Sequence, residues 1–164
     1  MNRILLGILI ILLFSLCSSN QQHSDLKEFC DYTVECYKND KRTEIINLKM
    51  TKKDVVDMLN KMKLPSEIKK QRLENAERME SEGYFDKKTL NTLYSDFRSM
   101  QDNDFWKHCT IDSYKYMETE KWYDYEMAEP IVVLKYGDYT AMFKIGELLK
   151  TKDGWKIIDW SSWK

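Results

Sequence analysis

The chain has 164 residues, of which 43% are apolar and 13% aromatic. This length and composition indicate one domain with a hydrophobic core and exclude a disordered or low-complexity chain. The 26 basic and 27 acidic residues nearly cancel, so the charge provides no footprint for nucleic acid and we predict no such partner.

The first residues have the pattern of an export signal. Arg3 precedes the apolar run Ile4–Leu16, which is too short to cross a bilayer comfortably and is ended by polar residues. We therefore predict a signal peptide over residues 1–19, a polar tether over 20–24 and one domain over 25–164. The predicted localisation is outside the cytoplasm, either in the cell envelope or secreted.

Two ways of cleaving this leader remain open. The segment Phe14–Cys17, followed by Ser18-Ser19-Asn20, resembles a bacterial lipoprotein signal, in which Cys17 would become the lipidated first residue. Leu16 departs from that pattern, which has Gly, Ala or Ser before the cysteine. Ordinary cleavage beside small residues is the alternative. The only membrane contact that we predict is therefore a lipid anchor on Cys17.

Helical signals occupy residues 25–100 of the predicted domain. The helices are defined by the spacing of apolar residues, by a capping box at Thr51–Asp54, by Pro65 as a stop and by Gly83 as a C-terminal signal. We predict helices over Asp25–Asn39, from Thr51 to Pro65, over Ser66–Glu82 with Ser66 as its cap, and over Asp86–Met100. The charged run Lys69–Glu82 is interpreted as a solvated helix face. We expect an extended link over Ile45–Met50, a loop over Gln101–Asp104 and strand structure from Phe105.

An antiparallel meander is predicted for the C-terminal part, over about 106–163. The turn signals Gly137-Asp138 and Asp153-Gly154 divide Ile131–Trp163 into three strands. The preceding aromatic segment predicts one bent strand, or two strands around Glu118–Glu120, and Gly146 predicts a sharp bend or a bulge. The fold class is therefore α+β, with N-terminal helices packed on a bent, cone-like antiparallel sheet.

The C-terminal part resembles the cystatin-like or nuclear-transport-factor-like (SnoaL-like) superfamily. The residues that carry this resemblance are the predicted strands Ile131–Tyr136 and Tyr139–Lys150 and the ending Asp153–Trp160. The resemblance covers Thr89–Trp163 and implies a cone-shaped sheet. Members include enzymes such as ketosteroid isomerase and many non-catalytic binding modules, so the resemblance implies a fold and no single activity.

The predicted domain contains Cys30, Cys36 and Cys109. In an exported protein an odd set of this kind suggests one disulfide and one remaining thiol. Cys30 and Cys36 would lie about 9 Å apart along one helix, beyond disulfide reach. We predict a Cys30–Cys109 bridge, and three buried free thiols remain the alternative.

Motifs for metals and nucleotides are absent from the sequence. Its only histidines are His23 and His108, so we predict no metal site and no cofactor. If His108 and Cys109 lie on one strand, they point to opposite faces and cannot act as a pair. An enzyme in the cone would need an acid and a base. The candidates, whose spacing assembles no catalytic constellation, are Asp112, Tyr114, Tyr116 and Asp159.

The number of Tyr and Trp residues exceeds what one sheet face requires. We expect a subset to line a ligand pocket or an interface, namely Tyr114, Tyr116, Trp122, Tyr125 and Tyr139. The predicted function is that of an exported, non-catalytic protein that binds a small apolar ligand or a protein partner. The alternatives are an isomerase- or hydrolase-like enzyme using an Asp/Tyr pair in the cavity, and an inhibitor- or immunity-type protein-binding module. A buried Asp–Tyr pair favours the enzyme, a carboxylate-free apolar cavity favours ligand binding, and an exposed aromatic patch favours the third.

Overall fold

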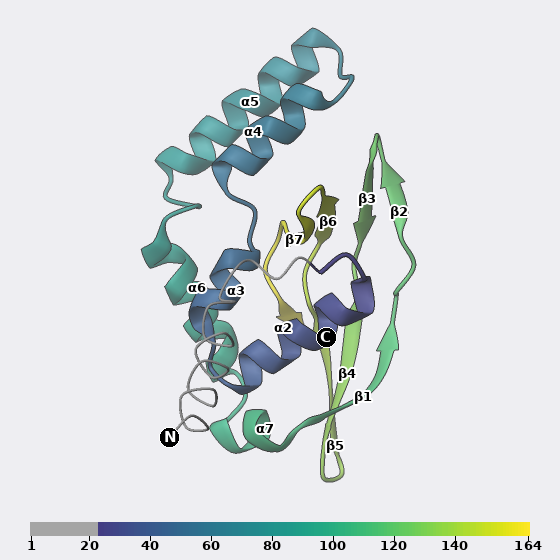
Figure 1. Cartoon of the computed structure of the whole chain (residues 1–164). Helices are drawn as coiled ribbons and strands as arrows, with labels where there is room; N and C mark the ends of the chain where they lie inside the picture. Colours follow the sequence, from purple (N-terminus) through teal and green to yellow (C-terminus); the bar gives the residue numbers. More distant parts are fainter. Residues whose placement is uncertain (1–22) are drawn as a thin grey trace, which may run out of the picture.

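The computed structural model describes residues 23–164, and the predicted signal peptide and Cys17 lie outside them. Helices come first in the chain and strands last (Figure 1), so the α+β prediction is confirmed. The elements are α2 (Leu26–Lys38), α3 (Arg42–Leu48), α4 (Lys52–Lys61), α5 (Ser66–Ser81), α6 (Lys87–Ser99), α7 (Asn103–His108), β1 (Thr110–Lys115), β2 (Glu120–Trp122), β3 (Tyr125–Ala128), β4 (Ile131–Tyr136), β5 (Tyr139–Lys144), β6 (Leu148–Thr151), β7 (Gly154–Ile157) and β8 (Ser162–Trp163).

The strands of residues 23–164 form two four-stranded antiparallel sheets, ordered β1-β4-β5-β8 and β2-β3-β6-β7. They are the two halves of one bent meander, because β1 continues into β2, β3 into β4 and β5 into β6. At the last bend Gly146 has φ +132°, and a Cβ there would lie 2.7 Å from the Asp159 carbonyl oxygen, so glycine is required. The predicted bend at Gly146 and the division around Glu118–Glu120 are both confirmed.

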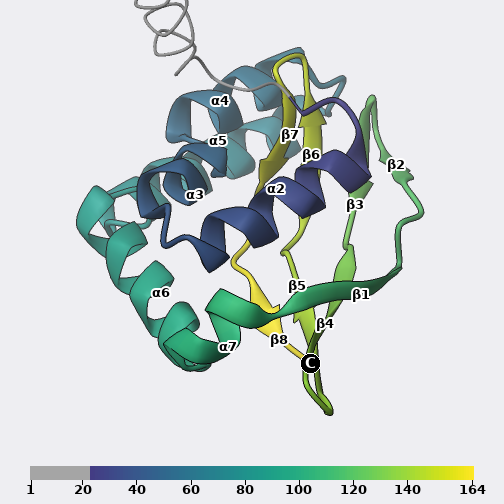
Figure 2. The ribbon, with the colours of Figure 1, turned by 60° about the horizontal axis from the view of Figure 1, so that its bottom comes forward.

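Aromatic side chains fill the interior of the bend. Helix α2 crosses the sheets (Figures 1 and 2) and places Tyr37 against Tyr94 and Trp106, with ring centroids 5.2 and 5.5 Å apart. Phe143 of β5 meets Tyr37 edge-on at 5.4 Å, and Trp163 of β8 stacks on Phe97 at 5.2 Å. Such pairs add to the free energy gained by burying the rings. Side chains of the described residues therefore fill the inside of the bent sheet.

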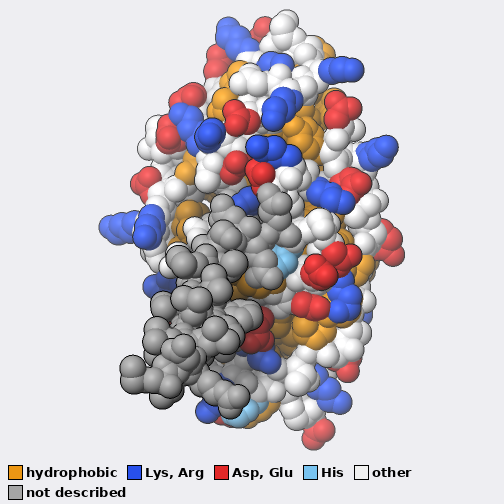
Figure 3. All heavy atoms as spheres, in the orientation of Figure 1, with side chains coloured by type: hydrophobic (Ala, Val, Ile, Leu, Met, Phe, Trp, Pro, Cys, Tyr) orange, Lys and Arg blue, Asp and Glu red, His pale blue; other side chains and the backbone are white. Residues whose placement is uncertain are grey.

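Helices α4 and α5 form a hairpin that stands beside the sheet β2-β3-β6-β7 (Figure 1). Its inner side buries Leu59, Met62 and Ala76, and the Arg72 guanidinium lies over the Trp122 ring at 5.5 Å. The acidic and basic side chains of Lys69–Glu82 are nearly all exposed and interspersed (Figure 3). The predicted solvated face of α5 is confirmed.

Two short helices, α3 and α7, were not predicted from the sequence, and the cap of α5 also differs. Residues 45–48 are helical in α3, because a helix buries Ile45 and Leu48 on the same side. The predicted loop Gln101–Asp104 holds for Gln101 and Asp102 only, and the predicted strand from Phe105 begins later, because α7 covers Asn103–His108. Its N-cap Asp102 accepts a hydrogen bond from the Phe105 N–H at 2.6 Å. Ser66 is the first residue of α5 and not its cap, which is Pro65.

Of the predicted tether 20–24, the structure describes His23 and Ser24, and His23 packs against the domain. His23 is 7% exposed, its ring lies 4.4 Å from that of Tyr32, and its carbonyl accepts a hydrogen bond from the Trp155 N–H at 3.1 Å. His23 is therefore part of the packed domain. Within residues 23–164, no helix combines the length and apolar character needed to cross a bilayer.

Candidate functional site

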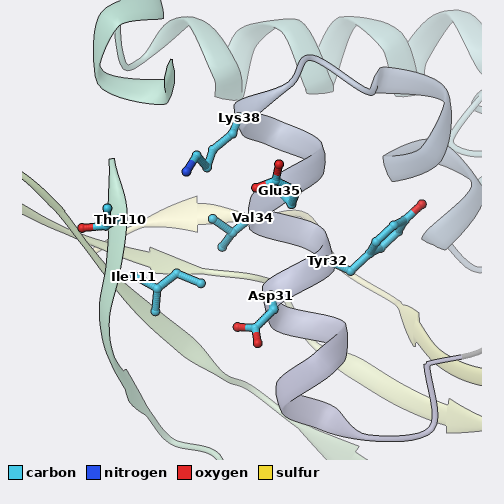
Figure 4. Close-up of a pocket in the computed structure, with 7 residues that line it drawn as sticks. All are labelled: Asp31, Tyr32, Val34, Glu35, Lys38, Thr110 and Ile111. Carbon is cyan, nitrogen blue, oxygen red and sulfur yellow. The ribbon is translucent and has the colours of Figure 1, made fainter. Parts of the chain in front are cut away.

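A groove runs between α2 and the edge strand β1, with a volume of about 500 Å³. Figure 4 shows Val34 and Ile111 pointing toward each other across it. Val34 is buried and Ile111 half-buried, so the floor of the groove is apolar. Tyr32 also borders the groove, but its ring points to the far side of α2 (Figure 4), where it contacts His23.

One end of the groove is closed by a polar contact between helix and strand. The Tyr114 hydroxyl donates a hydrogen bond to Asp31, and Lys27 donates to the same carboxylate at 2.8 Å. The Lys27 ammonium also lies 4.8 Å from the Tyr114 ring centroid. The hydrogen bonds to Asp31 and Tyr114 raise the pKa of Lys27. Burial and the hydrogen bond to Asp31 raise the pKa of Tyr114, so the phenol stays a donor. We interpret this trio as a clamp that holds β1 to α2.

The charges at the other end of the groove are less fully paired. Asn39 donates a hydrogen bond to the Glu35 carboxylate at 2.5 Å. Lys38 points toward the start of β1 (Figure 4), and among residues 23–164 no carboxylate lies within ion-pair distance of its ammonium. As far as the described part of the chain shows, the groove therefore offers an apolar floor and the unpaired ammonium of Lys38.

Strand β1 supplies unpaired backbone groups beside this groove. Within the described sheet it pairs with β4 alone, so half of its N–H and C=O groups point away from β4. The register shifts between Ile111 and Ser113, which makes Asp112 a bulge. A bulge interrupts regular pairing along an edge, so only a short segment can align with β1.

The four predicted catalytic candidates are not brought together. Tyr114 pairs with Asp31. The sequence prediction missed Asp31 because it lies 83 positions from Tyr114 in the chain. Asp112 is exposed at the bulge, and Tyr116 is 65% exposed. Asp159 lies in the segment between β7 and β8, where it accepts a hydrogen bond from the Trp160 N–H. The predicted Asp/Tyr enzyme site thus has one observed pair, and neither Asp112 nor Asp159 belongs to it.

The predicted interface aromatics are also dispersed. Tyr114 closes the groove, and Tyr116 borders a separate cleft with Lys115 and Ile131. Trp122 and Tyr125 flank the β2–β3 turn, whereas Tyr139 packs on Phe105 near α7. Tyr114, Tyr116, Trp122, Tyr125 and Tyr139 therefore do not form one patch.

The cysteines are not bridged in the structure. Cys30, Cys36 and Cys109 are all buried free thiols here, which is the arrangement given above as the alternative to the predicted Cys30–Cys109 disulfide. His108, at the end of α7, is exposed, and its Nε2 lies 3.4 Å from Asp104 Oδ1. His108 and Cys109 therefore face different surroundings, although they do not lie on a strand as supposed.

Among residues 23–164, no three His, Cys, Asp or Glu side chains gather where they could hold a metal ion. The resemblance to cystatin-like proteins stays a prediction. We compared the chain with protein-family models, curated proteins and solved structures, and none of them matches it.

Proposed function

We propose that this chain is an exported, non-catalytic binding protein that holds an extended peptide segment of a partner protein between α2 and β1. The carrying observation is an edge strand that faces a helix across an apolar-floored groove. Peptide-binding domains that extend a sheet by one strand use this arrangement, in which backbone hydrogen bonds supply affinity and side-chain pockets supply specificity.

The dimensions limit the length of the bound segment. Helix α2 rises about 10 Å between Asp31 and Lys38, which corresponds to about three residues of extended chain. The bulge at Asp112 interrupts β1, so regular pairing with this strand is limited to a segment of about the same length. A contact of this size buries little area, so the proposed binding is weak and reversible.

The charges suggest the chemistry of the partner. Asp31 already accepts hydrogen bonds from Lys27 and Tyr114, so it has little capacity for a further cation. Lys38 is the cation that remains available, and an acidic side chain of the peptide would form an ion pair with its ammonium. We therefore propose a segment with a β-branched residue over Val34 and Ile111 and a carboxylate at Lys38.

Export is part of this proposal and is supported by the apolar run Ile4–Leu16 and the polar residues after it. An intact mass of the protein from its native host tests it. A diacylglyceryl adduct on Cys17 would mean an envelope anchor, and a start at Ser18 or Asn20 without one would mean secretion. A protein that retains Met1 and the leader would contradict export.

The peptide proposal is tested by selecting binders from a displayed library of random decapeptides. We expect enriched sequences with alternating β-branched residues and one Asp or Glu. The Lys38→Glu variant should reverse the charge preference to Lys or Arg. Amide hydrogen exchange should show slower exchange in β1 when a selected peptide is bound.

Lys107→Glu provides the matched control, because Lys107 is exposed on α7 and does not line the groove. It changes the net charge as much as Lys38→Glu does, and it should leave the selected sequences unchanged. Enrichment of the same acidic peptides by Lys38→Glu would contradict this site, and a library without enrichment would contradict peptide binding.

A further inference from the structure

A second cleft lies between α3, the link to α4 and the start of α6, away from the groove at β1. Its volume is about 420 Å³, within the usual range of small-molecule sites. The lining consists of apolar, hydroxyl, amide and basic residues and includes no acidic side chain: Thr43, Ile46, Asn47, Lys49, Met50, Thr51, Phe85, Lys87 and Leu90.

Lys49 lines this cleft and is only 3% exposed. Its ammonium donates one hydrogen bond, to the Ile158 carbonyl at 3.0 Å, and lies 4.6 Å from the Trp160 ring centroid. Among residues 23–164, no carboxylate lies within ion-pair distance of it. Buried lysines are ordinarily paired, so the charge of Lys49 is incompletely compensated. Burial lowers the pKa of Lys49 to about 8, and the charge of the Asp159 carboxylate, which lies outside ion-pair distance, only partly opposes this shift.

The start of α6 adds to the positive character of the cleft. Its N-cap Asp86 makes no side-chain capping bond, and a Cβ at Gly83 would lie 3.0 Å from Asp86 Oδ2, so this carboxylate lies beside Gly83. Within residues 23–164 the first N–H groups of α6 therefore lack a side-chain acceptor, and such a helix start attracts anions. Lys87 in the same turn lines the cleft.

We propose that this cleft binds a small apolar monocarboxylate, such as a medium-chain fatty acid. Its carboxylate pairs with Lys49, and its hydrocarbon tail lies against Ile46, Phe85 and Leu90. The single buried ammonium of Lys49 matches a ligand with one negative charge. The apolar walls of the cleft favour a ligand whose remaining part is a hydrocarbon. A free inorganic anion would leave those walls uncovered.

Calorimetric titration with octanoate and with 1-octanol tests this site. We expect saturable binding of octanoate, with 1-octanol at least about tenfold weaker because it lacks the charge. Lys49→Met should weaken octanoate binding by a similar factor and leave 1-octanol binding unchanged. Lys144→Met is the control, since Lys144 pairs with Glu129 at 2.6 Å and lies outside the cleft.

A second pair of variants keeps the test decisive if Lys49→Met fails to fold. Lys87 lines the cleft, whereas its neighbour Lys88, which is also exposed, does not. Lys87→Met should weaken octanoate binding about threefold, as expected for an exposed charge, and Lys88→Met should have no effect. Equal affinities of octanoate and 1-octanol, equal effects of the Lys87 and Lys88 variants, or no octanoate binding at millimolar concentration would each overturn the proposal.

Discussion

Lys49 also makes the stability of the protein depend on pH. Burial lowers its pKa from an ordinary 10.5 to about 8. Between these values Lys49 is protonated in the unfolded chain and neutral in the folded one. The unfolded state then binds more protons, so the free energy of unfolding rises with pH across this window. The stabilising contribution is complete above about 10.5 and is lost as the pH falls through about 8.

We predict that the free energy of unfolding of the unmodified protein, relative to Lys49→Met, rises by about 2 kcal/mol from pH 7 to about 9.5. Urea denaturation at several pH values measures this difference. The comparison is needed because burial raises the pKa of Cys30 to about 12 and that of Cys36 to about 11. These thiols lower the stability of both proteins equally at high pH. A difference that does not change with pH would contradict the buried charge.

At the scale of elements, the clamp between α2 and β1 depends on Tyr114. Tyr114→Phe removes the hydrogen bond to Asp31 and keeps the ring. We predict a loss of about 1 kcal/mol in the free energy of unfolding, since the acceptor is charged but partly solvated. Urea denaturation measures the loss, and amide hydrogen exchange should quicken in β1.

Tyr116→Phe is the matched control for this clamp. Tyr116 is 65% exposed, and no hydrogen bond of its hydroxyl is found among residues 23–164. Its substitution should leave the stability within about 0.5 kcal/mol of the unmodified protein. Equal losses for Tyr114→Phe and Tyr116→Phe would mean that the bond to Asp31 contributes nothing.

Local signals predicted the elements whose interactions are close in sequence. The Thr51–Asp54 capping box is confirmed, with the Thr51 N–H donating to Asp54 at 2.9 Å. Helices α3 and α7 were missed because they have 7 and 6 residues. So few turns produce no clear 3.6-residue pattern, and helices this short depend on tertiary burial.

The candidate sites were less predictable because they also depend on contacts between residues that lie far apart in the sequence. Tyr114 was expected to contribute to a site, but its partner Asp31 becomes adjacent only when α2 lies beside β1. Lys49 follows a short apolar segment and has the sequence pattern of a linker lysine. Its burial arises because Lys49 forms a parallel bridge with Ile157 at the end of β7, where the Met50 N–H donates to the Ile157 carbonyl at 3.0 Å.

At the scale of the whole molecule, the first and last described segments hold each other in place. The Tyr37 hydroxyl in α2 donates to Ser161 Oγ at 3.3 Å, and Ser161 Oγ donates to the Ile145 carbonyl at 2.7 Å. The Trp155 N–H donates to the His23 carbonyl at 3.1 Å. Because α2 and the residues before it are hydrogen-bonded to segments from the C-terminal end of the chain, we expect α2 to unfold together with the sheet.

The three buried thiols provide a direct measurement of that cooperativity. Cys30 and Cys36 lie on α2 and Cys109 precedes β1, and all three are 0% exposed. Burial raises the pKa of each thiol, which suppresses the reactive thiolate. We predict no labelling of these cysteines by iodoacetamide in the native protein, and labelling of all three after unfolding without reductant. Mass spectrometry of the labelled peptides measures both states.

The same experiment separates the two arrangements of the cysteines. A Cys30–Cys109 disulfide would leave Cys36 as the only one of the three that is labelled in the unfolded protein without reductant. Three free thiols in one cooperative unit should instead become reactive over a single urea transition, coincident with the loss of circular dichroism. Labelling of Cys109 at lower urea than Cys30 would show that β1 opens before α2, because Cys109 directly precedes β1 and Cys30 lies on α2. That order would contradict cooperative unfolding and locate the weakest contact of the fold at the clamp between Asp31 and Tyr114.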